Sequence, residues 1–216
     1  NYVRINNKQK VMKLKTEQYE IKDIETVANL LKEGKVVAFP TDTVYGLACI
    51  YDNEEALKAL KACKIRPEEK PIPTMVSSFR QMEEIAIMSE EARDLAEEFM
   101  PGAFTMILKK NENLPDYLTN GLDTIGIRMP DDDFILHLID LCEKPLLVTS
   151  ANLSGEEPGK TGEEVLKQLD GRMDAIVMGC AKGDSSSTIV DVSDGDVRIL
   201  REGPISEKQI MKVLHK

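Results

Sequence analysis

The chain has 216 residues, of which 42% are hydrophobic and 31% charged, a balance typical of one globular domain with a sizeable core. A formal net charge of −10 argues against a protein that holds nucleic acid through a general basic surface. No run of about 18 apolar residues and no apolar leader stretch is present, so we expect a cytoplasmic protein without a membrane span.

Helical spacing of apolar residues and short β-branched runs predict the secondary structure along the chain. In the first half we expect a helix at 23–32, a strand at 35–40, a helix at 53–63, a strand at 71–76, two helical segments within 79–100 and strands at 104–109 and 123–129. In the second half we expect a helix at 134–142, a strand at 145–149, a helix at 161–169, strands at 174–179, 187–192 and 197–200, and a last helix after Ser206. Ser89 is a predicted N-cap, and Thr161-x-x-Glu164 and Ser206-x-x-Gln209 are predicted capping boxes. Early alternation of helices and strands, followed by clustered strands, favours an α/β fold with a mixed sheet.

Residues 1–20 are predicted to be a basic N-terminal extension, ahead of one domain at 21–216. Arg4 and four lysines lie in the first 15 residues without an acid. A solvated tail is one interpretation, and an RNA contact is the other.

The four cysteines, Cys49, Cys63, Cys142 and Cys180, lie far from one another and from both histidines. This spacing excludes a zinc site of close ligands and a disulfide framework, so we interpret all four as core residues. No cluster of protein side chains is expected to hold a metal.

Polar groups stand at the ends of several predicted strands, where an open α/β sheet commonly binds its ligand. They occur in FPTDTVYGL (39–47), TIGIRMP (124–130), VTSANLSG (148–155), SSSTIVD (185–191) and ILREGP (199–204). Arg128 lies between two apolar residues and needs an anionic partner, either one of the protein's own acids or a bound ligand. Together with Arg201 and the basic stretch KIRPEEKP (64–71), it favours an anionic ligand.

Two familiar chemistries are not supported by these motifs. VTSANLSG is not a G-x-S-x-G elbow, and only His137 is a plausible base, so a serine nucleophile is disfavoured. Neither GxxxxGK[ST] nor GxGxxG occurs, so a bound nucleotide must be held by separate side chains and backbone N–H groups.

Six motifs in order, FPTDTVYGLA, KIRPEEKP, PGAFTMIL, DTIGIRMPD, TSANLSG and STIVD with ILREG, resemble the YrdC-like threonylcarbamoyl-AMP synthases. The resemblance runs from about Ile24 to Ile205. It implies a twisted, mixed open α/β sheet flanked by helices, with a large concave ligand cavity. It also implies a nucleotidyltransferase that converts L-threonine, bicarbonate and ATP to threonylcarbamoyl-AMP and pyrophosphate. A partner transferase then modifies a tRNA adenosine next to the anticodon.

The resemblance also assigns roles by motif position. Lys64 and Arg66 are implied as catalytic residues. Threonine is expected to contact Thr43, Arg128, Ser150 and Ser187. ATP is expected to contact Arg66, Lys70, Thr124, Asn152, Thr161 and Arg201. Mg²⁺ should accompany ATP, with Asp42 as a candidate helper.

The chain departs from the family pattern at two positions and leaves two alternatives open. Lys70 replaces an asparagine, and Met75 stands where a histidine is usual. The alternatives are an RNA-binding module without activity and a carbamoyl-adenylate-forming domain. The second normally belongs to larger proteins with cysteine pairs, whereas this chain reads as the short, single-domain form.

Overall fold

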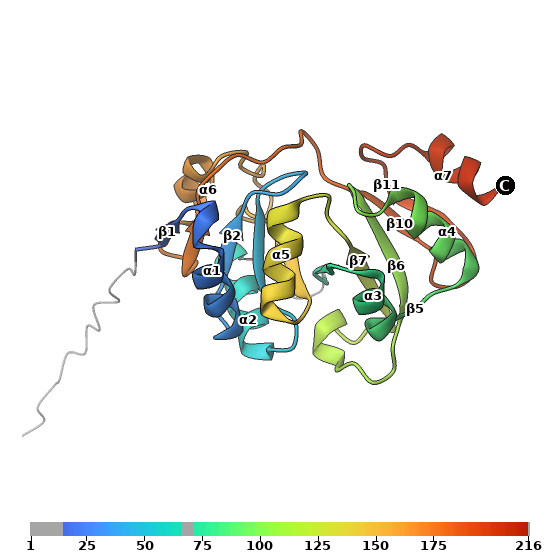
Figure 1. Cartoon of the computed structure of the whole chain (residues 1–216), viewed down its shortest axis with the longest axis horizontal. Helices are drawn as coiled ribbons and strands as arrows, with labels where there is room; N and C mark the ends of the chain where they lie inside the picture. The colour runs from blue at the N-terminus through green and yellow to red at the C-terminus, as the bar shows by residue number, and fades with distance from the viewer. Residues whose placement is uncertain (1–14, 66–70, 216) are drawn as a thin grey trace, which may run out of the picture.

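The computed structural model describes residues 15–65 and 71–215, and within them one mixed sheet carries the whole molecule (Figure 1). The strands are β1 (Glu17–Tyr19), β2 (Val37–Phe39), β3 (Gly46–Ile50), β4 (Thr74–Met75), β5 (Ala86–Ile87), β6 (Phe104–Lys110), β7 (Thr124–Arg128), β8 (Leu146–Ser150), β9 (Ala175–Val177), β10 (Thr188–Asp191) and β11 (Arg198–Arg201). The helices are α1 (Ile24–Lys32), α2 (Glu54–Lys64), α3 (Phe79–Ile85), α4 (Glu90–Phe99), α5 (Asp133–Cys142), α6 (Gly162–Leu169) and α7 (Glu207–Leu214), with 3-10 turns at Ile21–Asp23 and Asp116–Thr119. The predicted α/β class with a mixed sheet is confirmed.

The strand order is β1-β9-β2-β3-β8-β4-β7-β6-β10-β11, with β5 paired to β6. The sheet contains both parallel pairs, such as β4 with β7 and β6 with β10, and antiparallel pairs, such as β3 with β8 and β6 with β7. Several neighbours in this order, such as β9 with β2, β3 with β8 and β6 with β10, come from distant parts of the chain, so strand ends with polar residues meet at one place.

The helices cover the sheet in three groups, each with its own apolar cluster. On one face of β2, β3 and β8, α1 packs beside α5, with Leu31 and Leu138 fully buried (Figure 1). The opposite face of β2 and β3 is covered by α2 and α6. At the other end of the sheet, α3, α4 and α7 cover one face of β6, β7 and β10. Because side chains alternate across a strand, Met106 enters that cluster while its neighbour Thr105 faces away from it.

Helix ends follow the predicted capping chemistry. The Ser89 side chain accepts a hydrogen bond from the Ala92 backbone, and Ser206 and Gln209 form a reciprocal capping box. Thr161 accepts from the Glu164 N–H, but the Glu164 carboxylate accepts from the Lys160 N–H rather than from the N-cap, so this box is only half formed.

Three sequence-based predictions need correction. Residues 17–19 form β1 and pair in parallel with β9, so the sheet begins inside the predicted extension at 1–20; residues 1–14 lie outside the described residues. Only Thr74–Met75 of the predicted strand at 71–76 is a strand, because Pro71 and Pro73 lack the N–H that a ladder requires. Cys180 is exposed, whereas the other three cysteines are buried as predicted.

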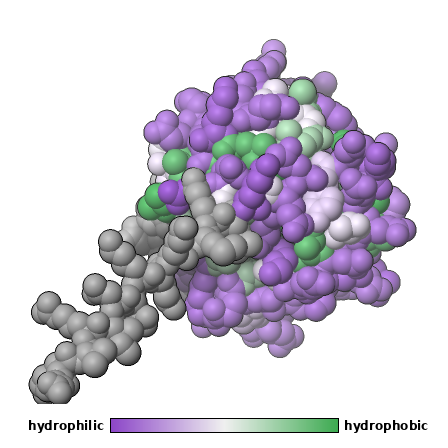
Figure 2. Space-filling model, turned by 90° about the vertical axis from the view of Figure 1, so that its left-hand side faces the viewer, coloured by the Kyte–Doolittle hydropathy of each residue, from purple (hydrophilic) through white to green (hydrophobic). Residues whose placement is uncertain are grey.

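The outer surface agrees with the high content of charged residues. The face in Figure 2 is largely hydrophilic, with hydrophobic side chains in small separate areas. In the described part of the chain, no helix is long and apolar enough to cross a lipid bilayer.

Candidate functional site

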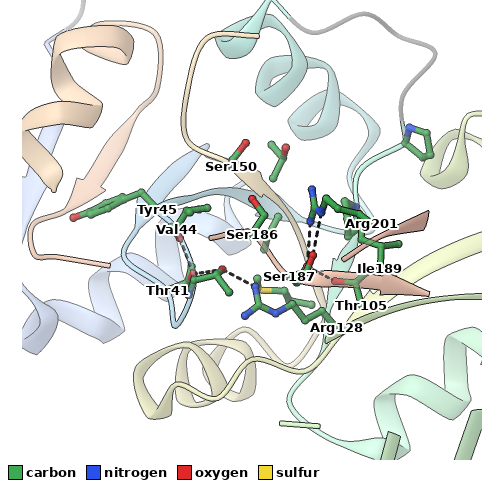
Figure 3. A pocket seen from close by; sticks show the side chains of 17 residues that line it. Thr41, Val44, Tyr45, Thr105, Arg128, Ser150, Ser186, Ser187, Ile189 and Arg201 are labelled. Carbon is green, nitrogen blue, oxygen red and sulfur yellow. Dashed lines mark hydrogen bonds between the residues drawn. The ribbon is translucent and has the colours of Figure 1, made fainter. Parts of the chain in front are cut away.

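A pocket of about 270 Å³ opens where the ends of β3, β7, β8 and β10 meet (Figure 3). This volume is close to the lower end of the range of about 300–1,000 Å³ that small-molecule sites occupy. Its polar lining comes from six segments of the chain, and includes Thr43, Thr105, Arg128, Ser150, Ser187 and Arg201. Val148, Ile189 and Pro73 supply apolar walls. The strand-end polar groups identified in the sequence therefore do converge.

Arg128 is the most deeply placed charge in the pocket. It ends β7, is 5% exposed, and is held on three sides. Nε donates to the Gly102 carbonyl at 3.1 Å, Nη1 to Thr43 Oγ1 at 2.9 Å and Nη2 to Asp42 Oδ1 at 2.5 Å. Burial lowers the pKa of the Arg128 guanidinium, and the Asp42 carboxylate opposes that shift by stabilising the charged form. The sequence predicted that Arg128 has an anionic partner, either an acid of the protein or a bound ligand. Asp42 is the acid of the protein, and the pocket beside Arg128 can still hold an anionic ligand.

The turn after β2 holds its shape through the hydroxyl of Thr41. Thr41 Oγ1 donates to the Val44 carbonyl at 2.6 Å and accepts from the Thr43 N–H at 3.0 Å, as in a side-chain-closed turn. The hydroxyls of Thr41 and Thr43 are also 3.0 Å apart. This local network fixes Thr43 at the pocket wall, where its hydroxyl accepts from Arg128.

On the opposite wall, Ser187 joins two strands and the second arginine. Its hydroxyl is 2.8 Å from Thr105 Oγ1, and the Nε of Arg201 donates to the Ser187 carbonyl at 3.0 Å (Figure 3). Because Thr105 pairs with Arg128 across β6 and β7, these contacts connect the two walls through one strand. Arg201 lines the pocket although much of its side chain is exposed to solvent.

Lys64 lies behind the third wall, at the end of α2. It is 2% exposed, and its Nζ donates to the Ser150 carbonyl and to Asn152 Oδ1, the latter at 3.0 Å. The Nδ2 of Asn152 in turn donates to the carbonyls of Leu153 and Glu156. The ammonium therefore ties α2 to the loop after β8 and holds Ser150 at the pocket.

Of the predicted threonine contacts, Thr43, Arg128, Ser150 and Ser187 all line the pocket. Of the predicted ATP contacts, Arg201 also lines the pocket. Asn152 does not line it, but accepts a hydrogen bond from Lys64 behind the pocket wall. Thr124 is at the opposite end of β7 from Arg128, and Thr161 caps α6, so neither reaches this pocket. Arg66 and Lys70 lie outside the described residues. These ATP roles remain predictions.

Several lining residues were not assigned from the sequence. Thr105 and Ser186 add hydroxyls, and Met75 places a thioether beside Arg128, its register partner on β7. Thr105 was detectable in principle, since it is the only polar residue in the apolar run Phe104–Leu108. Tyr45 also lines the pocket, but its hydroxyl donates to the Val177 carbonyl at 2.5 Å.

The described residues do not fit a Mg²⁺ ion held by protein side chains. Within 15–65 and 71–215, no three His, Cys, Asp or Glu residues are grouped for metal binding. Asp42 is also engaged, because Oδ1 accepts from Arg128 and Oδ2 accepts from the Asp131 N–H at 3.0 Å. The sequence-based suggestion that Asp42 assists a metal is therefore not supported by its contacts.

Comparison with known proteins gives consistent matches over most of the chain. The family model for Sua5, YciO and YrdC proteins, which bears the description telomere recombination, matches residues 29–203. A threonylcarbamoyl-AMP synthase of Pyrococcus abyssi is 37% identical over 203 residues, covering 92% of this chain and 59% of that protein. One of Bacillus subtilis is 39% identical over 194 residues, covering 88% of this chain and 56% of that protein.

The fold agrees with the same relationship. A crystal structure of P. abyssi Sua5 complexed with L-threonine matches with a TM-score of 0.86 at 36% identity, covering 92% of this chain and 60% of that chain. This chain thus spans about three fifths of the length of these relatives. On the family model, the identities and the shared architecture, the chain belongs to the Sua5/YciO/YrdC family.

Proposed function

We propose that this chain is a nucleotidyltransferase that makes threonylcarbamoyl-AMP and pyrophosphate from L-threonine, bicarbonate and ATP. The observation that carries the proposal is Arg128, a buried guanidinium that faces a hydroxyl-lined pocket of amino-acid size. The curated relatives that are 37% and 39% identical to the chain are named threonylcarbamoyl-AMP synthases, and a relative of the same fold is complexed with L-threonine.

The pocket supplies the groups that threonine requires. A guanidinium fork matches a carboxylate in two parallel hydrogen bonds, which suits Arg128 for the threonine carboxylate. Thr43, Ser150 and Ser187 offer hydroxyls for the amine and side-chain oxygen. Val148 and Ile189 offer an apolar surface for the methyl group.

In the proposed reaction, the threonine amine attacks bicarbonate and, with loss of water, gives a carbamate. A carbamate oxygen then forms a bond to the α-phosphorus of ATP while the bond to the β-phosphate oxygen breaks and pyrophosphate leaves. The protein contributes positioning and cationic groups rather than a covalent intermediate. We assign these cationic roles to Lys64, Arg66, Lys70 and Arg201, and Mg²⁺ enters on the phosphates of ATP.

ATP contacts are also proposed for Thr124, Asn152 and Thr161, none of which lines the threonine pocket. An adenylate of this kind is an activated acyl donor. We propose that a separate transferase accepts it and modifies a cytoplasmic tRNA adenosine.

The direct test is to incubate the pure protein with ATP, bicarbonate and each amino acid in turn, measuring pyrophosphate and identifying the adenylate by mass spectrometry. Threonine-specific, bicarbonate-dependent product is expected. Product from carbamoyl phosphate instead would indicate a carbamoyl-adenylate-forming domain. Salt-dependent RNA binding without ATP consumption would indicate an RNA-binding module. Arg128→Gln should abolish activity, and Arg80→Gln, at an exposed arginine on α3, is the matched control.

A further inference from the structure

Asp42 stands directly behind the pocket and uses both carboxylate oxygens within the protein. Oδ1 accepts from Arg128 Nη2 at 2.5 Å, and Oδ2 accepts from the Asp131 N–H at 3.0 Å. Its side chain is 10% exposed, against 6% for Arg128, so the ion pair is largely shielded from water. Asp42 is not among the described residues that line the pocket.

The contacts of Arg128 determine which of its donors remain for a ligand. A guanidinium has five N–H groups in a fixed plane. Gly102, Thr43 and Asp42 take one each, which leaves one N–H on Nη1 and one on Nη2. These two N–H groups are the guanidinium donors that the described contacts leave for a ligand carboxylate.

The turn that carries Asp42 is itself fixed by neighbouring segments. Lys182 and Gly183 donate backbone hydrogen bonds to the carbonyls of Thr41 and Thr43 at 2.9 and 3.1 Å. Gly183 packs so closely that a Cβ there would lie 2.7 Å from the Asp42 carbonyl oxygen. The carboxylate therefore has little freedom to follow Arg128 if the arginine moves.

From these contacts we propose that Asp42 is a positioning residue, which aims Arg128 so that its two remaining N–H groups meet the carboxylate of the amino-acid substrate. The proposal rests on the proposed function for the identity of that substrate. It assigns Asp42 no contact with substrate, ATP or metal. Removing Asp42 should thus weaken amino-acid binding while leaving the nucleotide site and the chemical step intact.

The first test is the steady-state kinetics of Asp42→Asn. The threonine KM is expected to rise at least about tenfold, as for loss of one charge-assisted hydrogen bond, with kcat at saturating threonine and the ATP KM within about twofold. Asp42→Glu keeps the negative charge but displaces it by one methylene, so we expect a smaller rise of about threefold. Asp131→Asn removes an exposed carboxylate from the same region and should change nothing, because only the Asp131 backbone contacts Asp42.

The second test reports on Arg128 without any substrate. In ¹⁵N spectra of arginine side chains, the Nε–H of Arg128, assigned through Arg128→Lys, should be protected from solvent exchange because it donates to Gly102. Asp42→Asn should increase that exchange rate at least about tenfold, while thermal unfolding confirms that the variant is folded. If Asp42→Asn does not fold, the threonine KM and the Nε–H exchange rate are measured in Asp42→Glu instead.

The outcomes separate this proposal from the proposed function. Faster Nε–H exchange in a protein that does not use threonine would retain the positioning role and refute the function. An active enzyme in which Asp42→Asn changes neither the threonine KM nor the exchange rate would overturn the positioning role. Equal losses in threonine KM, ATP KM and kcat would also overturn it, since they indicate general disruption of the site.

Discussion

The hydroxyls of Thr105 and Ser187 lie 2.8 Å apart, although 82 positions separate them in the sequence. Parallel pairing of β6 with β10 places them together, and pairing of β6 with β7 places Thr105 beside Arg128. Thr105 is thus the bridge between the arginine wall and the serine wall of the pocket. The pairing of strands in the sheet, rather than the conformation of any one loop, therefore positions these site residues.

Replacing Thr105 by valine should weaken the site without disrupting the strand. Valine keeps the branched shape but cannot hydrogen-bond to Ser187, a loss of about 1 kcal/mol for one neutral hydrogen bond. We expect the threonine KM to rise about fivefold, measured by pyrophosphate release, with the Tm nearly unchanged. An unchanged KM would show that Ser187 is placed by other contacts.

The matched variant is Thr74→Val, on β4, which is separated from β6 by β7. The Thr74 hydroxyl is buried and, within the described residues, has no hydrogen-bond partner. Removing an unpaired buried polar group should raise the free energy of unfolding by about 1 kcal/mol, measured by urea denaturation. Activity should stay as in the unmodified chain. Lower stability would mean that the hydroxyl has a partner in solution.

Local sequence patterns predicted most of the elements, and the exceptions have identifiable causes. The runs at 104–109 and 123–129 are rich in β-branched and apolar residues, and they form β6 and β7. In contrast, β3 has the sequence GLACI, whose glycine, alanine and cysteine have little strand preference, and its position in the sheet comes from pairing with β2 and β8. Residues 17–19 form a strand only because β9 is beside them.

Site residues that belong to a local sequence motif were predictable. Contacts between site residues that depend on which strands pair in the sheet were not. Arg128 between two apolar residues indicated an anionic partner from sequence alone. That Asp42, 86 positions away, would hold its Nη2 could not be inferred, because no local pattern encodes which strand lies beside which. Lys64 was named through the family resemblance as part of the basic stretch after the predicted helix, but its burial depends on the loop after β8 and could not be inferred.

Lys64→Met tests whether that buried ammonium is required. Methionine keeps an unbranched side chain, one atom shorter than that of lysine, but removes the donors to Ser150 and Asn152. We expect activity to fall about a hundredfold, comparable to loss of one well-placed donor in an active site. Lys58→Met is the control on the same helix, since Lys58 is exposed and, among the residues that the structure describes, forms ion pairs with Glu54 and Glu55 at the surface. Similar effects of the two variants would argue against a specific role for Lys64.

Stability in acid should depend on Asp191, at the end of β10. Burial acts to raise the pKa of Asp191, but hydrogen bonds from Ser193 and Arg198 outweigh it and lower the pKa below the ordinary value of 3.8. A lowered pKa in the folded state means that the stabilisation is present above pH 3.8 and is lost as the pH falls through the folded-state pKa.

Asp191→Asn should therefore reduce the free energy of unfolding by about 1 kcal/mol at pH 7 and by much less near pH 3. Asp196→Asn, at an exposed carboxylate in the following turn, should show no such difference. Denaturation curves at the two pH values check this. A constant penalty for Asp191→Asn across the pH range would mean that its charge is not involved.

The most direct test of the account is calorimetric titration of L-threonine into the unmodified chain, Arg128→Lys and Arg80→Lys. Lysine keeps the charge but cannot form the paired hydrogen bonds of a guanidinium. We predict that the unmodified chain and Arg80→Lys bind threonine equally, and that folded Arg128→Lys binds at least about tenfold more weakly. Equal binding by Arg128→Lys, or no threonine binding by the unmodified chain, would contradict it.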